Sequence, residues 1–273
     1  GLSLEFNRKK EIIDIDGKPQ SDWDGSLGGP VSAAPALTIE NATFGPALRA
    51  TEGQQWGQLY RNGIKRDANG NALINTNGTY VYDNNTRFGS VLPDFTGGVQ
   101  NSFTILDNFT INVNIDYQKG GKFYSTSTKW GNSTGVLAGS AGLNDKGIPV
   151  RNAVSDGGGI HIFGVDATTL KPVDYYVNAR DYLNGSNNTF DNDIFDLTYV
   201  KLREVSVGYN IPVSKLGMSK WIKRANFSVI ASNALLIYAK NRDFDPSEIS
   251  AQSGEGGQFP GLRGFGVNLK LGF

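Results

Sequence analysis

A serine motif is the first feature of the sequence that could support catalysis. Gly131-Asn132-Ser133-Thr134-Gly135 matches the G-x-S-x-G pattern, in which a strained strand-to-helix turn exposes a serine nucleophile. Asp145 and His161 follow it in the chain order of a hydrolase triad. Residues 136–142 are a poor helix, however, so a polar loop is the preferred interpretation and His161 is a solvated residue rather than a base. We expect no enzyme activity, and mutating Ser133 would test the alternative.

Two short acidic clusters could bind a cation. Asp67, Asn69 and Asn71 surround Gly70 as in a calcium loop, but the terminal glutamate is missing, which favours a tight turn. Asp191-Asn192-Asp193 is interpreted as a polar loop before a strand. The chain has no cysteine and one histidine, which excludes disulfides, thiol nucleophiles and any site built from several histidines. We therefore expect neither a metal nor a cofactor.

Composition excludes further classes of protein. Lys+Arg and Asp+Glu are both 26, so there is no basic footprint for a nucleic acid. The 35 glycines among 273 residues, with leucine and alanine not dominant, argue against a helical bundle. No apolar run approaches the roughly 18 residues that a membrane helix needs, and the first residues do not form a secretory signal.

The hydropathy pattern has a period of two. Between Phe109 and Lys119 every odd residue to Tyr117 is apolar and every even one is polar. The same alternation fills 265–273 and, more briefly, 2–7. Such segments predict strands with one apolar and one wet face. In a further segment, 195–211, the apolar face changes parity near Arg203-Glu204, which predicts a bulge.

Strand length and loop length together favour a membrane barrel. The alternating segments are about ten residues long, which suits a tilted strand crossing a bilayer. Strands of a soluble sandwich are usually about five or six residues long. Leu106-Asp107-Asn108 reads as a tight turn, whereas 9–90 and 120–194 are long and polar. Short turns that alternate with long loops are typical of outer-membrane barrels, with the turns periplasmic and the loops extracellular.

The predicted fold is all-β, a transmembrane antiparallel β-barrel segment. We place outer loops at about 9–90, 120–194 and 240–261. Six strands are too few to close a barrel, and the chain begins within the pattern, so we expect it to be the C-terminal part of a larger barrel. The expected strands are at about 1–8, 91–104, 109–119, 195–211, 224–239 and 262–273.

Several segments resemble the C-terminal third of SusC/RagA-type TonB-dependent outer-membrane transporters. The resemblance is collinear over roughly 50–273 and looser over 1–15, whereas 16–50 departs from the family. Its strongest part is Asp196 to Tyr209, with the sequence DLTYVKLREVSVGY. The other matching segments are 57–60, 66–71, 107–125, 144–151, 157–160, 232–235, 243–248 and Leu269-Lys270-Leu271-Gly272-Phe273.

The resemblance implies a 22-stranded barrel of a Gram-negative outer membrane, filled by an N-terminal plug. It implies uptake of oligosaccharides or oligopeptides, a SusD-like surface lipoprotein over the mouth, and energy delivered through TonB. The plug and the TonB-contacting segment have no counterpart in these 273 residues, so the chain by itself should transport nothing. The other implied partners are the rest of the barrel and membrane lipid.

Aromatic residues near the expected strand ends allow two interpretations. Trp221, Tyr209 and Phe273 are near inner ends, and Phe123, Tyr124 and Trp130 lie beyond an outer end. Two aromatic girdles would have this arrangement, and we favour that interpretation. Stacking on a sugar is the functional alternative.

The candidates for substrate binding are Trp130, Tyr124 and Trp56. A soluble all-β, lectin-like glycan-binding module stays open as an alternative function, because it would also use exposed rings. Expression without detergent would distinguish it from a transporter.

Overall fold

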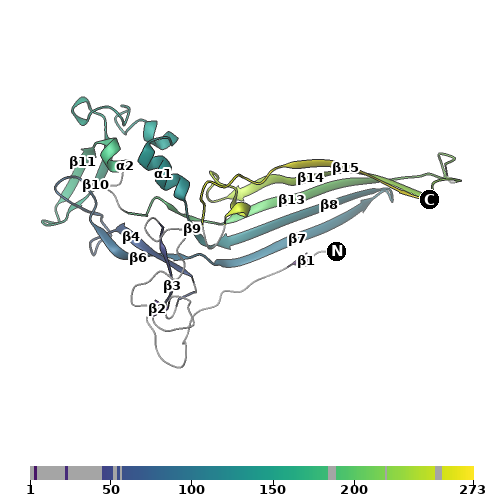
Figure 1. The fold of residues 1–273 in the computed structure, drawn as a ribbon, viewed down its shortest axis with the longest axis horizontal. Coiled ribbons are helices and arrows are strands. Elements are labelled where there is room, and N and C mark those ends of the chain that lie inside the picture. Colours follow the sequence, from purple (N-terminus) through teal and green to yellow (C-terminus); the bar gives the residue numbers. More distant parts are fainter. Residues whose placement is uncertain are drawn as a thin grey trace, which may run out of the picture.

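The chain folds into a long antiparallel sheet joined at one end to a smaller head (Figure 1). This computed structural model describes residues 3–4, 22–23, 45–51, 54–55, 57–183, 189–218, 220–249 and 254–273. We use "head" for the described residues of 22–23, 45–92 and 121–198. Most regular structure is β-strand, with few and short helices, which confirms the all-β prediction.

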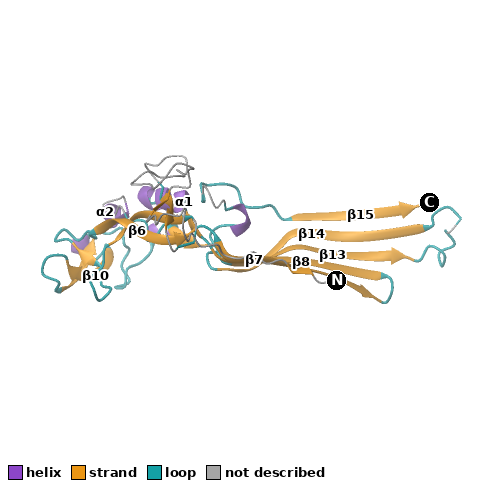
Figure 2. Ribbon diagram, turned by 90° about the horizontal axis from the view of Figure 1, so that it is seen from below, coloured by secondary structure: helices purple, strands orange, loops and turns teal. Residues whose placement is uncertain are grey.

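The long sheet has six strands in the order β1-β7-β8-β13-β14-β15, and every neighbouring pair is antiparallel. Figure 2 shows these strands running side by side away from the head. Among the described residues, β1 and β15 are its open edges. The strands are β1 (Ser3–Leu4), β7 (Pro93–Ile105), β8 (Phe109–Gly120), β13 (Tyr199–Ile211), β14 (Arg224–Ala239) and β15 (Gly264–Gly272).

The far end of the long sheet, which we call the hairpin end, carries the turn between β7 and β8. Leu106 and Asp107 both have left-handed backbones, with φ of 51° and 59°. Ile105 pairs with Phe109, so three residues connect the strands and the predicted tight turn is confirmed. The loop from 212 to 223 and the C-terminus lie at the same end (Figure 1).

The head contains strands where the sequence predicted long outer loops. The sequence predicts an outer loop over about 9–90, and the four-stranded sheet β2-β3-β4-β6 and the strand β5 lie within that range. Register shifts between Leu59 and Tyr60, and between Arg61 and Gly63, interrupt the period of two and hide β4 from pattern analysis. These strands are β2 (Asp22–Trp23), β3 (Ala47–Thr51), β4 (Gln58–Ile64), β5 (Leu73–Ile74) and β6 (Tyr82–Ser90).

The segment 120–194 is likewise structured. It holds a three-stranded sheet in the order β11-β10-β5 and the ladder between β9 and β12. Its strands are β9 (Lys122–Tyr124), β10 (Ile160–Asp166), β11 (Pro172–Val177) and β12 (Ile194–Asp196). Its helices are α1 (Thr126–Thr134), α2 (Ala179–Leu183), η1 (Ala138–Ala141) and η2 (Val154–Asp156), and η3 (Pro246–Glu248) follows in the loop after β14.

Most of the buried apolar residues in the described part of the chain lie in the head. Leu48, Leu59 and Val91 form a buried cluster, and the partly buried side chain of Ile194 packs against it. Ile74 on β5 and Ile162 on β10 are fully buried, and these two strands pair with each other. The long sheet differs, since eight of nine residues of β15 are exposed. The head therefore has a hydrophobic core, whereas the long sheet leaves its apolar residues uncovered.

No helix in the described part of the chain is both long enough and apolar enough to span a membrane.

Candidate functional site

One face of the long sheet is apolar across several strands. Residues directly opposite each other in neighbouring strands project from the same face. The register therefore aligns apolar side chains in rows that cross four strands. Two of these rows are Phe109, Tyr209, Phe227, Leu269 and Ile111, Val207, Val229, Val267.

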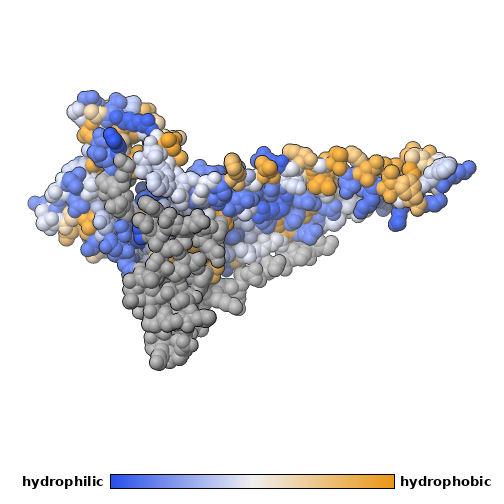
Figure 3. All heavy atoms as spheres, viewed as in Figure 1, coloured by the Kyte–Doolittle hydropathy of each residue, from blue (hydrophilic) through white to orange (hydrophobic). Residues whose placement is uncertain are grey.

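These apolar rows are accessible to solvent in the chain. Phe265 is 81% exposed and Val267 is 74% exposed. Figure 3 shows apolar residues gathered along the β14 and β15 side of the long sheet. A patch of this extent on a protein marks a surface that contacts another protein or a membrane.

The opposite face is polar. Asn112 on β8 faces Ser206 on β13, and its amide donates a 3.0 Å hydrogen bond to the serine hydroxyl. Asn114 faces Glu204 in the same register. Nearer the hairpin end, Asn226 donates to Asn210 at 2.8 Å. The long sheet is therefore two-faced, with a wet side and an apolar side.

A register shift in β13 keeps apolar residues on one face of the sheet and polar residues on the other. The register with β8 shifts between Leu202 and Glu204, which confirms the bulge predicted near Arg203. Before the shift, Lys201 pairs with Asp116 and Leu202 pairs with Ile115. The shift thus places Leu202 on the apolar face although its parity differs from that of Val205.

Aromatic residues lie at both ends of the apolar face. Phe109 and Tyr209 are in contact at the hairpin end, with ring centroids 4.7 Å apart. Tyr117 contacts Phe95 near the head, at 5.9 Å. The eight steps from Phe109 to Tyr117 span about 26 Å along the strand, comparable with the apolar band about 25 Å tall of an outer-membrane barrel.

Phe123 and Tyr124 do not form the outer aromatic girdle that the sequence predicted. Both rings are buried in the head rather than arranged around the sheet. The backbone turns at Gly120 and Gly121, with φ of 75° and 85°, and β9 then pairs with β12. The aromatic row next to the head is instead formed by residues within the strands, such as Tyr117.

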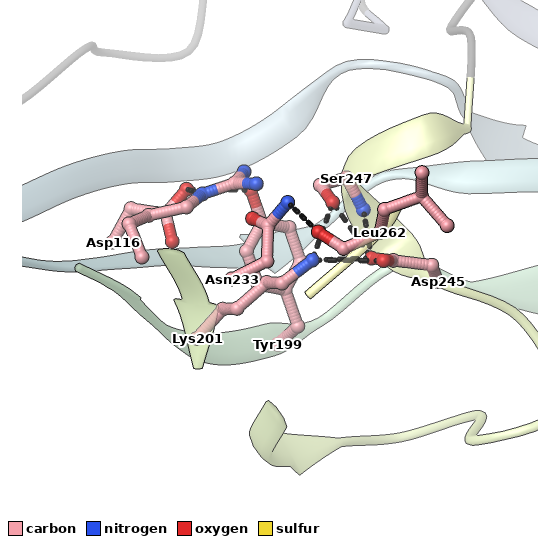
Figure 4. Close-up of polar contacts among 8 residues, drawn as sticks. Asp116, Tyr199, Lys201, Asn233, Asp245, Ser247 and Leu262 are labelled. Carbon is pink, nitrogen blue, oxygen red and sulfur yellow. Dashed lines mark hydrogen bonds and ion pairs between the residues drawn. The ribbon is translucent and has the colours of Figure 1, made fainter. Parts of the chain in front are cut away.

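A buried ion pair lies where the polar face meets the loop after β14. Lys201 has a side chain only 4% exposed, and its ammonium group lies 2.8 Å from both carboxylate oxygens of Asp245. It also donates to the hydroxyl of Ser247 at 2.8 Å. Figure 4 shows that this contact ties β13 to the short helix η3. Sequence analysis missed the pair because its members are far apart in the chain.

The surroundings of Asp245 favour its charged form. Burial alone would raise the pKa of this carboxyl, but the hydrogen bonds from Lys201 and Ser247 outweigh it and hold the pKa below its ordinary value. Next to this pair, Nε of Arg203 donates to Asp116 at 2.7 Å. Lys201 and Arg203 of β13 are thus each paired with a carboxylate from another element.

A second ionic cluster joins the head to the long sheet. Asp196 lies 3.4 Å from Lys122 and 3.0 Å from Lys240, and it accepts from the backbone and hydroxyl of Thr198. Burial opposes the charge, but these bonds outweigh it and lower the pKa of Asp196 to about 2. The carboxylate thus remains charged at any physiological pH.

The three predicted substrate-binding residues have different environments. Trp130 lies on α1 and is 50% exposed. Tyr124 is 2% exposed and packs against Phe190 with ring centroids 5.5 Å apart, so its faces are covered in this structure. Trp56 lies outside the described residues. The structure does not bring Trp130 and Tyr124 into one open site, and their role in binding stays a prediction.

The residues of the hydrolase motif do not form a triad. Ser133 lies in the last turn of α1, and Gly135 ends the helix with φ of 74°, so the motif is not a strand-to-helix turn. Both ring nitrogens of His161 contact aspartates, Nδ1 with Asp145 at 2.9 Å and Nε2 with Asp174 at 2.6 Å. Neither nitrogen is therefore available to activate a serine.

The acidic clusters are used within the fold. Asp67 accepts from the backbone of Asn69 and Asn71, as expected of a tight turn. Asp193 forms a 3.0 Å ion pair with Lys129, and Asp191 accepts from the backbone of Ile64. The part of the chain that the structure describes contains no group of three or more histidine and acidic residues arranged for a metal.

Comparison with known proteins gives a result at the level of structure only. No family model matches the chain, and no curated protein sequence is similar to it. A solved structure of the RagAB peptide transporter matches with a TM-score of 0.58 and 14% identity, over 99% of this chain and 26% of that one. The fold is shared with this transporter.

Two further RagAB structures agree. The peptide importer in its closed-closed state has a TM-score of 0.55 and 15% identity, over 99% of this chain and 27% of that one. The open-open state has a TM-score of 0.57 and 15% identity, over 100% and 26%. At these identities the likeness shows the fold alone, and the chain spans about a quarter of the length of the chains it matches.

Proposed function

We propose that this chain forms the last strands and outer loops of a SusC/RagA-type, TonB-dependent outer-membrane transporter. The two-faced sheet carries the proposal. Its apolar face spans about 26 Å between aromatic rows, and five of its strands are nine residues or longer. A soluble lectin-like module would need to cover that face, and no described part of this chain does so.

The transporter is an energised channel for oligomeric nutrients rather than an enzyme. The structural relatives are described as a peptide transporter and a peptide importer. That description supports oligopeptides as cargo, and the family resemblance extends the class to oligosaccharides. In this proposal the polar face, with Asn112, Asn114 and Asp116, lines the interior of a plugged 22-stranded barrel.

The head then lies outside the cell, where it meets the substrate and a SusD-like lipoprotein. The tight turn at 106–108 lies at the opposite end of the sheet from the head (Figure 1). In outer-membrane barrels short turns are periplasmic and long connections are extracellular. The open edges β1 and β15 pair with other strands of the same barrel, because unpaired backbone groups are not tolerated in lipid.

Lipid accessibility tests this proposal directly. A spin label at position 113 of the full-length protein in lipid should be relaxed by a lipid-soluble agent. A label at position 114 is the matched control and should not be, because Val113 pairs with Val205 on the apolar face and Asn114 pairs with Glu204 on the polar face. Protection of position 113 from lipid would contradict the membrane assignment.

A further inference from the structure

A pocket of about 540 Å³ lies in the head between the end of α1 and the start of α2. Its walls include Asn132 and Ser133 on α1, Arg151 on the loop before η2, and Asn178 and Arg180 at α2. The pocket is therefore assembled from three segments that are separate in the chain. None of the described residues that line it is acidic.

Arg151 is held in a fixed position in this pocket. Its Nε donates to the carbonyl of Ser140 at 2.8 Å, and Nη2 donates to the carbonyl of Gly135 and the hydroxyl of Ser140 at 2.5 and 2.7 Å. A guanidinium has five N–H donors, so these contacts leave both hydrogens of Nη1 without an acceptor among the described residues. The three hydrogen bonds of Arg151 hold the end of α1 in place. The two N–H groups of Nη1 take no part in this structural role.

Within the part of the chain that the structure describes, no carboxylate is paired with the arginines of the pocket. Neither Arg151 nor Arg180 has a carboxylate within ion-pair distance in the described part of the structure. Two lysines of the head are paired with carboxylates, Lys122 with Asp196 and Lys129 with Asp193. Two unpaired guanidinium groups at the wall of one concave, polar pocket produce a local positive potential.

We propose that this pocket binds a carboxylate group carried by the oligomer that the transporter takes up. Guanidinium groups recognise such oxoanions through paired N–H···O bonds. Asn132, Ser133 and Asn178 supply further polar groups around it. The inference rests on the proposed transport function and narrows its substrates to oligomers with an acidic group, either peptides or acidic glycans.

Matched probes test the inference on the full-length transporter in detergent. One pair is a hexapeptide with a free C-terminal carboxylate and the same peptide as its amide. The other pair is an oligogalacturonate and its methyl ester. Arg180→Gln and Arg151→Gln should weaken binding of the acidic member of one pair about tenfold, with the neutral member unchanged. The affected pair identifies the source of the anion.

Two comparisons keep this result interpretable. Arg66→Gln removes an exposed arginine outside the pocket and should leave all affinities unchanged. The side chain of Arg180 makes no hydrogen bond within the described residues, so Arg180→Gln separates the effect of charge from any structural effect of replacing Arg151. Equal loss for acidic and neutral probes, or no loss in either variant, would overturn the inference.

The outcome is also separable from that of the proposed function. Uptake of a neutral probe by cells that carry the wild-type transporter supports transport whatever the pocket does. If neutral and acidic probes are taken up alike by wild type and both variants, only the pocket inference fails. If no oligomer of either class is bound or taken up, the proposed function fails and the pocket inference fails with it.

Discussion

Nδ1 of His161 lies 2.9 Å from Oδ2 of Asp145, and this contact closes the turn at 143–149 onto the β10–β11 ribbon. On the other side of the ring, Nε2 lies 2.6 Å from Asp174. The ring of Tyr176 stacks on the imidazole with centroids 4.6 Å apart, and its hydroxyl donates to Asp145. Carboxylates only accept, so both contacts form together only when the imidazole is doubly protonated.

This arrangement predicts that the turn at 143–149 depends on the imidazole. His161→Ala removes the contacts with both Asp145 and Asp174. Amide hydrogen exchange in 143–149 should therefore be faster in this variant than in the wild type. Unchanged exchange would show that the contact does not hold the turn.

At low pH the same turn should loosen through Asp145. The hydrogen bond from Tyr176, together with His161, holds the pKa of this carboxyl below its ordinary value of 3.8. A lowered carboxyl pKa stabilises the fold above the unfolded value and loses that effect as pH falls through the folded one. Tyr176→Phe should move the acid loosening to higher pH, measured by the same exchange experiment.

The two faces of β8 predict unequal tolerance of charge. Val113→Arg should lower the stability of the assembled barrel by about 2–4 kcal/mol, the cost of a charge that faces lipid at mid-bilayer. Asn114→Arg should cost much less, since Asn114 faces Glu204 across the polar side. The urea midpoint for unfolding of the protein in micelles measures both. Equal costs would show that the two positions share one environment.

Removing one member of the Lys201–Asp245 pair should be costly. Asp245→Ala leaves a buried ammonium without its carboxylate and should destabilise the assembled protein by about 3 kcal/mol. Lys201→Met in addition should recover much of this loss, because the unpaired charge is then gone. Asp243→Ala, at an exposed position in the same loop, is the control. Thermal unfolding followed by electrophoretic mobility reports all three.

Two substitutions in the turn of the β7–β8 hairpin should raise the stability of the protein. Leu106 and Asp107 adopt left-handed backbones, which cost residues with a β-carbon about 1–2 kcal/mol each. Leu106→Asn with Asp107→Gly should raise the unfolding midpoint by the equivalent of about 1 kcal/mol. Asp107→Ala keeps the β-carbon and should bring no gain, which separates backbone strain from any effect of charge.

Sequence patterns predict the strands of the long sheet because each strand has one polar and one apolar face. The alternation in β8 and β15 follows from that arrangement, and the change of parity at Arg203 betrays the bulge. The strands of the head are invisible to the same reasoning. β4, for example, has a register shift between Arg61 and Gly63 and buried residues on both faces, so no period of two develops in it.

The candidate site is less accessible to sequence reasoning than the fold. Arg151 and Arg180 line one pocket only because the head brings three segments together. Lys201 and Asp245 meet across two elements. Conversely, the polar residues near Tyr124 in the sequence favour an exposed ring. The β9–β12 ladder instead turns this ring inward, where it is buried. Tertiary contacts decide each of these cases.

The β9–β12 ladder also bears on how the long sheet assembles. β8 and β13 are neighbours, although 78 residues separate Gly120 from Tyr199. Lys122 pairs with Asp196 immediately next to the sheet, and Thr198 accepts from the backbone of Gly120. Once the head has folded, the two strands start as an ordinary hairpin rather than as the ends of a long flexible chain. By holding the two strand ends together, the folded head shortens the conformational search for a strand pairing whose members are far apart in the sequence.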